Sequence, residues 1–371
     1  MVNDQMKKWF DSNALLLSML IGALGYKLFL PLAPLLPVLI FFMLFFTFCK
    51  VNPLDLRLHR WHWVVLFAQL VLSFASYAAV LSLTRNNILA QGILMCFIMP
   101  TATAAPIIAG KMGGSIQNLT TFTLLSNFAT ALIVPATFPL ITSDLSILHS
   151  QFSILHSQFL PAFLLILSRV APLLLGPFFA AWLLRIGYNY YQRRKYLSAS
   201  ETRGLSVIRS VSASGLSVED GLPTFTLSKK LALIPFYLWV ASIVVLMAVV
   251  TRTVIENIHY TLSVIPYLLV GSFFACLIQF SLGKLIGWWL PAPSKGKDYQ
   301  DVLINPAAAP KTMQGVSSIT AGQAFGQKNT SLGVWMAQTY LDPLSALGAA
   351  AYIIWQNIFN SAQLALAARK K

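Results

Sequence analysis

The residues best suited to chemistry lie together in one stretch near the end of an apolar chain. The stretch Ser317 to Gly333, SSITAGQAFGQKNTSLG, mixes carboxamides and a lysine with glycines. Such a stretch suits a bundle interior rather than a lipid-facing helix, because every backbone polar group in a bilayer needs a partner inside the protein. We expect a broken helix lining a cavity, where secondary transporters bind their substrates. Its candidate binding residues are Gln323, Gln327, Lys328 and Asn329, and its candidate breaks are Gly322 and Gly326.

A second interrupted stretch lies in the first half of the chain, from Cys96 to Gly114. Pro100 and Pro106 interrupt an apolar run there, with Thr101 and Thr103 between them. Proline frees backbone groups that neighbouring segments must then satisfy. Two interrupted segments in corresponding halves indicate a transporter site. The alternative is a pair of kinked structural helices, but it gives no reason for the lysine of the other stretch.

The composition places these stretches in a membrane. Of the 371 residues, 57% are hydrophobic and 10% are charged, whereas soluble domains contain about 25% charged residues. The chain therefore reads as a polytopic membrane protein. Its net charge of +15 does not indicate nucleic-acid binding, because the basic residues lie in loops between apolar runs. The three cysteines fall in or beside apolar runs, so they predict core residues rather than disulfides.

The run lengths predict an all-α fold with ten transmembrane helices in two inverted five-helix repeats, in which helices 4 and 9 are broken and cross. Residues 1–187 would form the first repeat plus span six, and residues 231–371 would form spans seven to ten. Between them, residues 188–230 read as a basic, Ser-rich cytoplasmic linker. The clearest runs are Ala14–Leu30, His62–Leu83, Ile88–Ala109, Leu119–Ile141, Phe159–Leu184, Leu231–Val250, Leu262–Leu290 and Leu344–Ala368.

The basic residues predict the orientation. With both termini in the cytoplasm, the external loops contain only Lys27, Arg85 and Arg252, while Arg169 and Lys328 lie within spans. The remaining lysines and arginines are then cytoplasmic, as the positive-inside rule requires. We therefore expect a multi-pass protein of the plasma (inner) membrane with both termini inside.

A short duplication offers a metal site that we do not favour. The heptapeptide SILHSQF occurs twice in succession and contains His149 and His156. The two histidines are seven residues apart, and only Asp144 lies near them as a further ligand. An extended loop or an extra helical turn explains the repeat better. We expect neither a metal nor a cofactor.

Three places resemble the bile acid:sodium symporter family, of which the chain looks like a divergent member. Pro100 to Pro139 resembles the family's fourth and fifth spans, and Val170 to Gly176, VAPLLLG, is similar to its Pro-x-x-x-Gly motif in span six. Ala324 to Gly333 stands where the family has Glu-x-Gly-x-Gln-Asn, and Leu344 to Ala368 resembles its last span. The resemblance implies that spans three to five and eight to ten form a core that moves against a panel of spans one, two, six and seven.

The chain departs from the family where sodium would bind. The resemblance assigns ion-ligand roles to the Glu and Gln of the ninth-span motif, and these positions hold Ala324 and Lys328. In the fourth span the family's Ser-Asn pair is replaced by Ala105 and Pro106. Sodium is a hard cation that needs a cage of oxygens. Because all eleven acidic residues fall in loops or at span ends by this reading, no carboxylate remains in the membrane to hold the ion.

Lys328 then has a physical interpretation. Its ammonium could stand in for the missing cation and hold the site together through Gln327, Asn329 and the freed carbonyls. Burial disfavours the charged form of an amine, so proton coupling through Lys328 is a second role. A lysine that extends to the headgroup region is the structural alternative, although the middle of a segment is a poor place for it.

We therefore predict a secondary transporter of a small organic anion that works by an elevator-like alternating-access mechanism without sodium coupling, and not an enzyme. An auxin-carrier-like relative of similar topology is the nearest variant. The alternatives are a sodium-coupled symporter of bile-acid type and a non-transporting membrane scaffold or sensor. Its expected partners are the anion and the lipid bilayer. The predicted substrate-binding residues are Thr101, Thr103, Thr123, Asn127, Arg169, Gln323, Gln327, Lys328 and Asn329.

Overall fold

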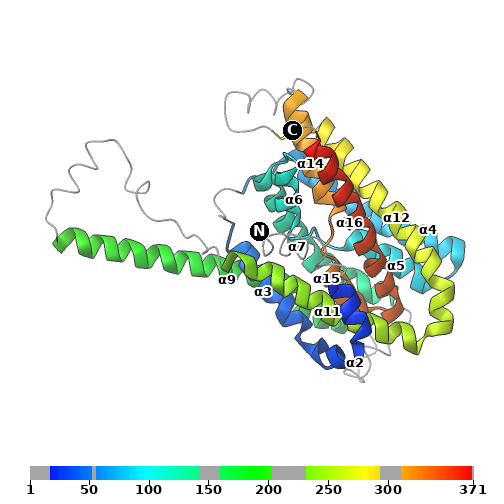
Figure 1. Ribbon diagram of the computed structural model, residues 1–371. Helices are drawn as coiled ribbons and strands as arrows, with labels where there is room; N and C mark the ends of the chain where they lie inside the picture. Colours follow the sequence, from blue (N-terminus) through cyan, green and yellow to red (C-terminus); the bar gives the residue numbers. More distant parts are fainter. Residues whose placement is uncertain (1–16, 52–55, 143–158, 203–230, 293–310, 370–371) are drawn as a thin grey trace, which may run out of the picture.

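The computed structural model describes residues 17–51, 56–142, 159–202, 231–292 and 311–369 (Figure 1). Within these ranges the chain is helical apart from turns, short connections and one isolated β-bridge. Six of the described helical segments are long and apolar enough to cross a membrane, which agrees with a polytopic membrane protein. These segments are Tyr26–Phe48, Arg60–Thr84, Ile116–Ile141, Phe159–Gln192, Ile234–Glu256 and Ile258–Trp289.

The N-terminal elements pack against a helix from the second half of the chain. Residues 17–24 are helical, and after them come α2 (Tyr26–Phe29), the 3-10 helix η1 (Leu30–Leu35) and α3 (Leu36–Phe48). The prolines of this region lie in η1 and in the first turn of α3, where a missing N–H is tolerated. Gly22 lies so close to α11 (Ile234–Glu256) that an added Cβ would overlap the Val244 carbonyl oxygen.

The first predicted interruption is present. The stretch after α4 (Arg60–Thr84) divides into α5 (Asn87–Ile98) and the short α6 (Ala105–Lys111), with residues 99–104 unwound between them. Pro106 lies in the first turn of α6, so it starts a helix rather than breaking one. The long helix α7 (Ile116–Ile141) follows, and the Ser115 hydroxyl caps it by accepting from Asn118 N–H.

Two long helices lead into the second half. Helix α9 (Phe159–Thr202) continues well past Leu184, where the apolar run ends, and extends beyond the body of the protein (Figure 1). The first part of the predicted 188–230 linker is therefore helical, whereas residues 203–230 lie outside the described residues, as does the SILHSQF duplication. After α11 comes α12 (Ile258–Trp289).

The second interruption separates α14 (Lys311–Gly326) from α15 (Thr330–Tyr340), and it is followed by η5 (Pro343–Ser345) and α16 (Ala346–Ala368). Only one of the two glycines predicted as breaks is at the break. Gly322 lies inside α14, where an added Cβ would overlap the Lys284 side chain of α12. Its small size serves close helix packing, and the helix ends at Gly326 instead.

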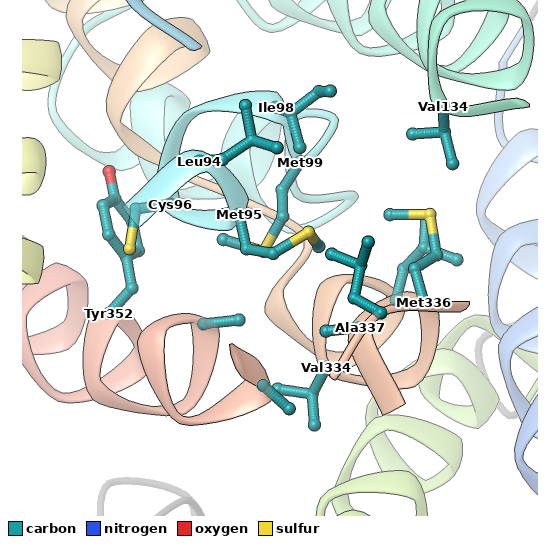
Figure 2. Packing of buried hydrophobic residues seen from close by; sticks show 14 of the residues in the cluster. Leu94, Met95, Cys96, Ile98, Met99, Val134, Val334, Met336, Ala337 and Tyr352 are labelled. Carbon is teal, nitrogen blue, oxygen red and sulfur yellow. The ribbon is translucent and has the colours of Figure 1, made fainter. Parts of the chain in front are cut away.

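Glycine contacts bring the helices around both interruptions into close packing. A Cβ on Gly348 of α16 would overlap the backbone of Gly92 in α5, and a Cβ on Gly287 of α12 would overlap the Ser317 carbonyl of α14. Around them the apolar side chains of α5, α7, α15 and α16 form one buried cluster, part of which is shown in Figure 2. These helices therefore form a tightly packed unit around the two breaks.

Candidate functional site

The two unwound segments pair with each other in the interior of the protein. Ala102 N–H donates to the Gln327 carbonyl at 2.9 Å, and Asn329 N–H donates to the Pro100 carbonyl at 2.8 Å. Thr101 and Lys328 face each other in an antiparallel bridge between these two bonds. Residues 99–104 and 327–329 are called the crossing below. The pairing satisfies backbone groups that the breaks release, which a membrane interior requires.

One helix on each side holds the crossing through a side-chain oxygen. On α7, the Ser126 hydroxyl accepts from Thr101 N–H at 2.8 Å. On α16, the Gln356 amide oxygen accepts from Lys328 N–H at 3.0 Å. The Thr101 hydroxyl also donates to the Ala324 carbonyl at 2.7 Å. Both strands of the crossing therefore have an anchor of the same kind, and Thr101 joins them.

Carbonyl groups near the ends of α5 and α14 are occupied by protein donors. Gln69 of α4 donates to the Ile98 and Met99 carbonyls at 3.3 and 3.0 Å. Gln279 of α12 donates to the Cys96 carbonyl at 3.1 Å, and the Tyr352 hydroxyl donates to the Gly326 carbonyl at 2.8 Å. The sequence prediction missed these residues. Lone glutamines inside apolar runs, as at positions 69 and 279, were the signal that could have found them.

The side chain of Lys328 is buried at the crossing and has no hydrogen-bonding partner among the described residues. The residue is 1% exposed, which excludes a side chain that extends to the headgroup region. Its Nζ has no hydrogen-bonding partner in the described part of the chain and lies 5.2 Å from the centroid of the Phe325 ring. A ring face attracts a cation, but it does not replace an anion or an oxygen ligand.

The expectation that Lys328 binds Gln327, Asn329 and the freed carbonyls is therefore wrong for this conformation. The groups it was expected to bind have other partners. The Gln327 amide donates to Gln323 at 2.7 Å, and the Asn329 side-chain oxygen caps α15 by accepting from Leu332 N–H at 3.3 Å. The nearby carbonyls accept from the donors described above. Asn329 Nδ2 has no partner in the described part of the chain, so two neighbouring residues of the crossing present unused donors.

The amides of α14 form a chain that reaches α16. Gln327 donates to Gln323, and Gln323 donates to Gln363 at 3.3 Å. Gln356 and Gln363 are two turns apart, so they lie on one face of α16, with Asn360 between them. The sequence does not predict this polar face, because its three amides lie within an otherwise apolar run, Leu344–Ala368.

The remaining predicted residues divide into two groups. Thr123 and Asn127 are buried on α7 near Ser126, and Asn127 donates to the Thr123 carbonyl at 2.7 Å while its Oδ1 has no hydrogen-bonding partner among the described residues. Thr103 is half-buried in the crossing itself. Arg169 is exposed on α9, within electrostatic range of Tyr340 at the other end of α15. The structure thus brings Arg169 near the far end of α15 rather than to the crossing.

Among the described residues, no acidic residue lies at the crossing. Glu201 lies near the end of α9, Glu256 is exposed at the end of α11, and Asp342 caps η5 by accepting from Leu344 N–H. The described residues contain no group of histidines, cysteines and carboxylates that could hold a metal ion. The N-terminus of α15 adds a positive partial charge to the crossing, and Lys328 adds a full positive charge when its amine is protonated.

Long apolar helices, together with two broken helices that cross in the interior, define a multi-pass membrane protein of the transporter class. Comparison with family models agrees: the model of the sodium bile acid symporter family matches residues 37–217. The chain belongs to this family, whose members are secondary transporters of organic anions rather than enzymes. The match covers α3 to α9 and ends before the second interruption. No curated protein matches the chain significantly.

Proposed function

We propose that the protein transports a small organic anion by alternating access and binds it at the crossing without sodium. The observation that supports this most directly is the buried amine of Lys328, which has no hydrogen-bonding partner among the described residues. A charge removed from water is costly unless it is paired. A substrate carboxylate would supply the missing partner, and the N-terminus of α15 would favour the same charge.

The proposed architecture is ten spans in two inverted five-helix repeats, in the plasma (inner) membrane with both termini inside. The equivalent roles of Ser126 and Gln356 at the crossing support a two-fold relation between the repeats. Inverted repeats that meet at broken helices are the arrangement in which many transporters alternate.

An elevator-like motion is the proposed mechanism. Close contacts at glycines hold α5 against α16 and α12 against α14. In the proposed mechanism these four helices move together as the core. The N-terminal helices, α9 and α11 would form the panel. In this division residues 1–187 supply the first repeat and span six, residues 188–230 the linker, and residues 231–371 spans seven to ten.

Independence from sodium is supported by what occupies the oxygens of the site. Sodium needs several free oxygen ligands, whereas backbone carbonyls near both breaks already accept from Thr101, Gln69 and Tyr352. The unpaired oxygens among the described residues here are neutral side-chain amides rather than carboxylates. The ammonium of Lys328 would also repel a second cation, at a cost on the order of several kcal/mol in a poorly screened site. The family's description favours the second candidate, a sodium-coupled symporter of organic anions.

One experiment separates the two candidates. Purified protein in liposomes is assayed for uptake of the anions that stabilise it against heat, with sodium or potassium as the only external cation. We expect equal uptake in both salts and a loss of at least tenfold in Lys328→Gln, which removes the charge and keeps a polar side chain. Lys284→Gln is the control, because Lys284 lies on the neighbouring α12. Uptake that requires sodium, or that survives Lys328→Gln unchanged, refutes the proposal.

A further inference from the structure

The crossing has unpaired acceptors beside it as well as unpaired donors. Among the described residues, Gln69 Oε1 and Gln279 Oε1 have no hydrogen-bonding partner. The same holds for four atoms in or beside the crossing: the donors Lys328 Nζ and Asn329 Nδ2 and the acceptors Asn127 Oδ1 and Asn360 Oδ1. The residues of these four atoms are 1%, 5%, 0% and 6% exposed, respectively. Buried polar atoms in native proteins nearly always have partners. Unpaired donors in the crossing and unpaired acceptors on the two helices that anchor it therefore indicate a ligand with matching groups.

The orientation of two of these amides is fixed by the backbone. Asn127 uses its Nδ2 to donate to the Thr123 carbonyl at 2.7 Å, which leaves its oxygen as the unused half. Asn329 uses its Oδ1 to cap α15, which leaves its nitrogen as the unused half. Rotating either amide by half a turn would break its bond to the backbone. Asn127 therefore presents an acceptor and Asn329 presents a donor.

The two acceptors flank the crossing from opposite partner helices. Asn127 directly follows Ser126, whose hydroxyl holds the Thr101 strand of the crossing. Asn360 lies one turn beyond Gln356, whose side chain holds the Lys328 strand. Residues four apart on a helix share a face, so Asn360 lies on the face of α16 that contacts the crossing. A ligand that pairs with both asparagine oxygens would thus contact α7 and α16 as well as the crossing.

We propose that the transported anion also carries a hydrogen-bond donor, a hydroxyl or an amide N–H, which is recognised by Asn127 and Asn360. This inference rests on the proposed function. Ionised carboxylates offer only acceptors, so a simple carboxylate satisfies Lys328 and Asn329 but leaves both asparagine oxygens unpaired. The substrate class is then hydroxycarboxylates and N-acylated amino acids, rather than plain carboxylates of the same size.

The chemistry predicts strong discrimination between close analogues. A site with a buried group that needs a partner rejects a ligand that lacks it, because the group stays unpaired and desolvated. We expect the donor-bearing member of a matched pair to bind about tenfold or more tightly than its partner. Suitable pairs are lactate with propionate, malate with succinate, and N-acetylglycine with 4-oxopentanoate, in which a methylene replaces the N–H.

The test measures the affinity of the purified full-length protein for each of these six anions by calorimetric titration. We expect a donor preference in at least one pair and its loss in both Asn127→Leu and Asn360→Leu, in which the donor-bearing anion should bind no more tightly than its plain partner. Asn357→Leu is the matched control: Asn357 lies on the same helix and donates to the Ile353 carbonyl, as Asn127 does to Thr123. It should keep the preference.

Each contrary outcome overturns the inference. Equal affinity within every pair, a preference that persists in both variants, or no binding of any pair shows that Asn127 and Asn360 do not recognise a donor on the ligand. The first and the third outcome are measured on the unmodified protein, so they hold even if the variants fold poorly. Failure of the proposed function is a different result: then no anion, including larger ones such as taurocholate, would bind in a manner that depends on Lys328. Binding of plain carboxylates through Lys328 with no donor preference would leave the transporter proposal intact and refute this one.

Discussion

At the scale of single residues, the crossing contains one basic residue and no acidic residue. Lys328 is fully buried at the crossing, while Ala324, where the family resemblance expects a carboxylate, is an apolar side chain at 0% exposure. The two departures belong together, because an acid at position 324 would offer the ammonium a partner inside the protein. With alanine at position 324, a ligand would have to supply the partner of the Lys328 ammonium.

This reasoning predicts the effect of rebuilding the two positions. The double change Ala324→Glu with Lys328→Gln replaces a methyl and an ammonium by a carboxylate and an amide, which are oxygen ligands for sodium. We expect uptake that is stimulated by sodium in the double variant, while Lys328→Gln alone stays impaired in sodium and in potassium. Initial uptake rates in the two salts measure the effect.

The control for that prediction is Ala321→Glu combined with Lys328→Gln. Ala321 is as fully buried as Ala324 and lies one turn earlier on α14. A carboxylate there adds the same charge and bulk, but it is displaced from the break by a turn. Sodium stimulation of both double variants would contradict a specific ion position at 324.

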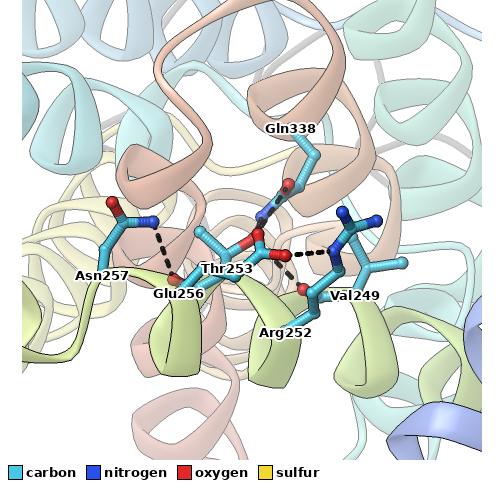
Figure 3. A network of polar contacts seen from close by, with 6 residues as sticks. All are labelled: Val249, Arg252, Thr253, Glu256, Asn257 and Gln338. Atoms are coloured by element: carbon cyan, nitrogen blue, oxygen red, sulfur yellow. Dashed lines mark hydrogen bonds and ion pairs between the residues drawn. The ribbon is translucent and has the colours of Figure 1, made fainter.

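At the scale of elements, α15 links the crossing to a helix of the proposed panel. Its first turn follows Asn329, and near its other end the Gln338 amide lies 3.3 Å from the Thr253 hydroxyl of α11 (Figure 3). Gln338 also donates to the Pro343 carbonyl at 3.0 Å, which fixes its position. The proposed core and panel are therefore joined by a polar contact about one short helix away from the crossing.

We predict that Thr253→Val changes the rate of transport and leaves the apparent affinity for the anion unaltered. Losing one hydrogen bond of about 1 kcal/mol shifts a two-state equilibrium about fivefold. Maximal uptake rates in liposomes measure the shift. Glu256→Gln is the control, because it removes only an ion pair with Arg252 whose side chains are 53% and 55% exposed, and such pairs contribute little. Identical rates in both variants would show that the contact does not limit the motion.

The close approach of α5 and α16 makes a second prediction at this scale. Gly348→Ala should lower the melting temperature sharply, because the new methyl group meets the backbone of Gly92 and overpacking of this kind costs about 1–3 kcal/mol or more. Gly187→Ala provides the matched control, since Gly187 is also helical and an added Cβ there contacts nothing. Thermal unfolding in detergent compares the two. Equal melting temperatures would argue against rigid coupling of these helices.

At the scale of the whole molecule, orientation in the membrane follows from the distribution of basic residues. We predict that alkaline phosphatase, which is active only outside the cytoplasm, is active when fused after Ser150 and inactive when fused after Ser212. Both positions lie outside the described residues, and the argument uses only the charges of the loops. Normalising each activity to the amount of fusion protein controls for expression. The opposite pattern would invert the proposed topology.

Much of the fold follows from the sequence because it depends on local chemistry. Long apolar runs predict helices that cross a membrane, and six such helices are among the described residues. Pro100 and Gly326 mark the two breaks, because each residue acts on the backbone at its own position. The burial of Lys328 was also expected, since an ammonium in the middle of a span has no route to water.

The tertiary structure alone decided which groups meet. No local pattern tells that the two breaks pair, that Gly322 packs against α12 instead of ending a helix, or that Arg169 lies near Tyr340 and away from the crossing. Gln356 and Asn360 gain their importance only because α16 turns that face toward Lys328. These outcomes depend on contacts between separate segments, from 28 residues apart for Lys328 and Gln356 to 223 for Thr101 and Ala324. The sequence therefore determined the helices, their breaks and the buried charge, whereas packing between helices decided which donors and acceptors remain unpaired for a ligand.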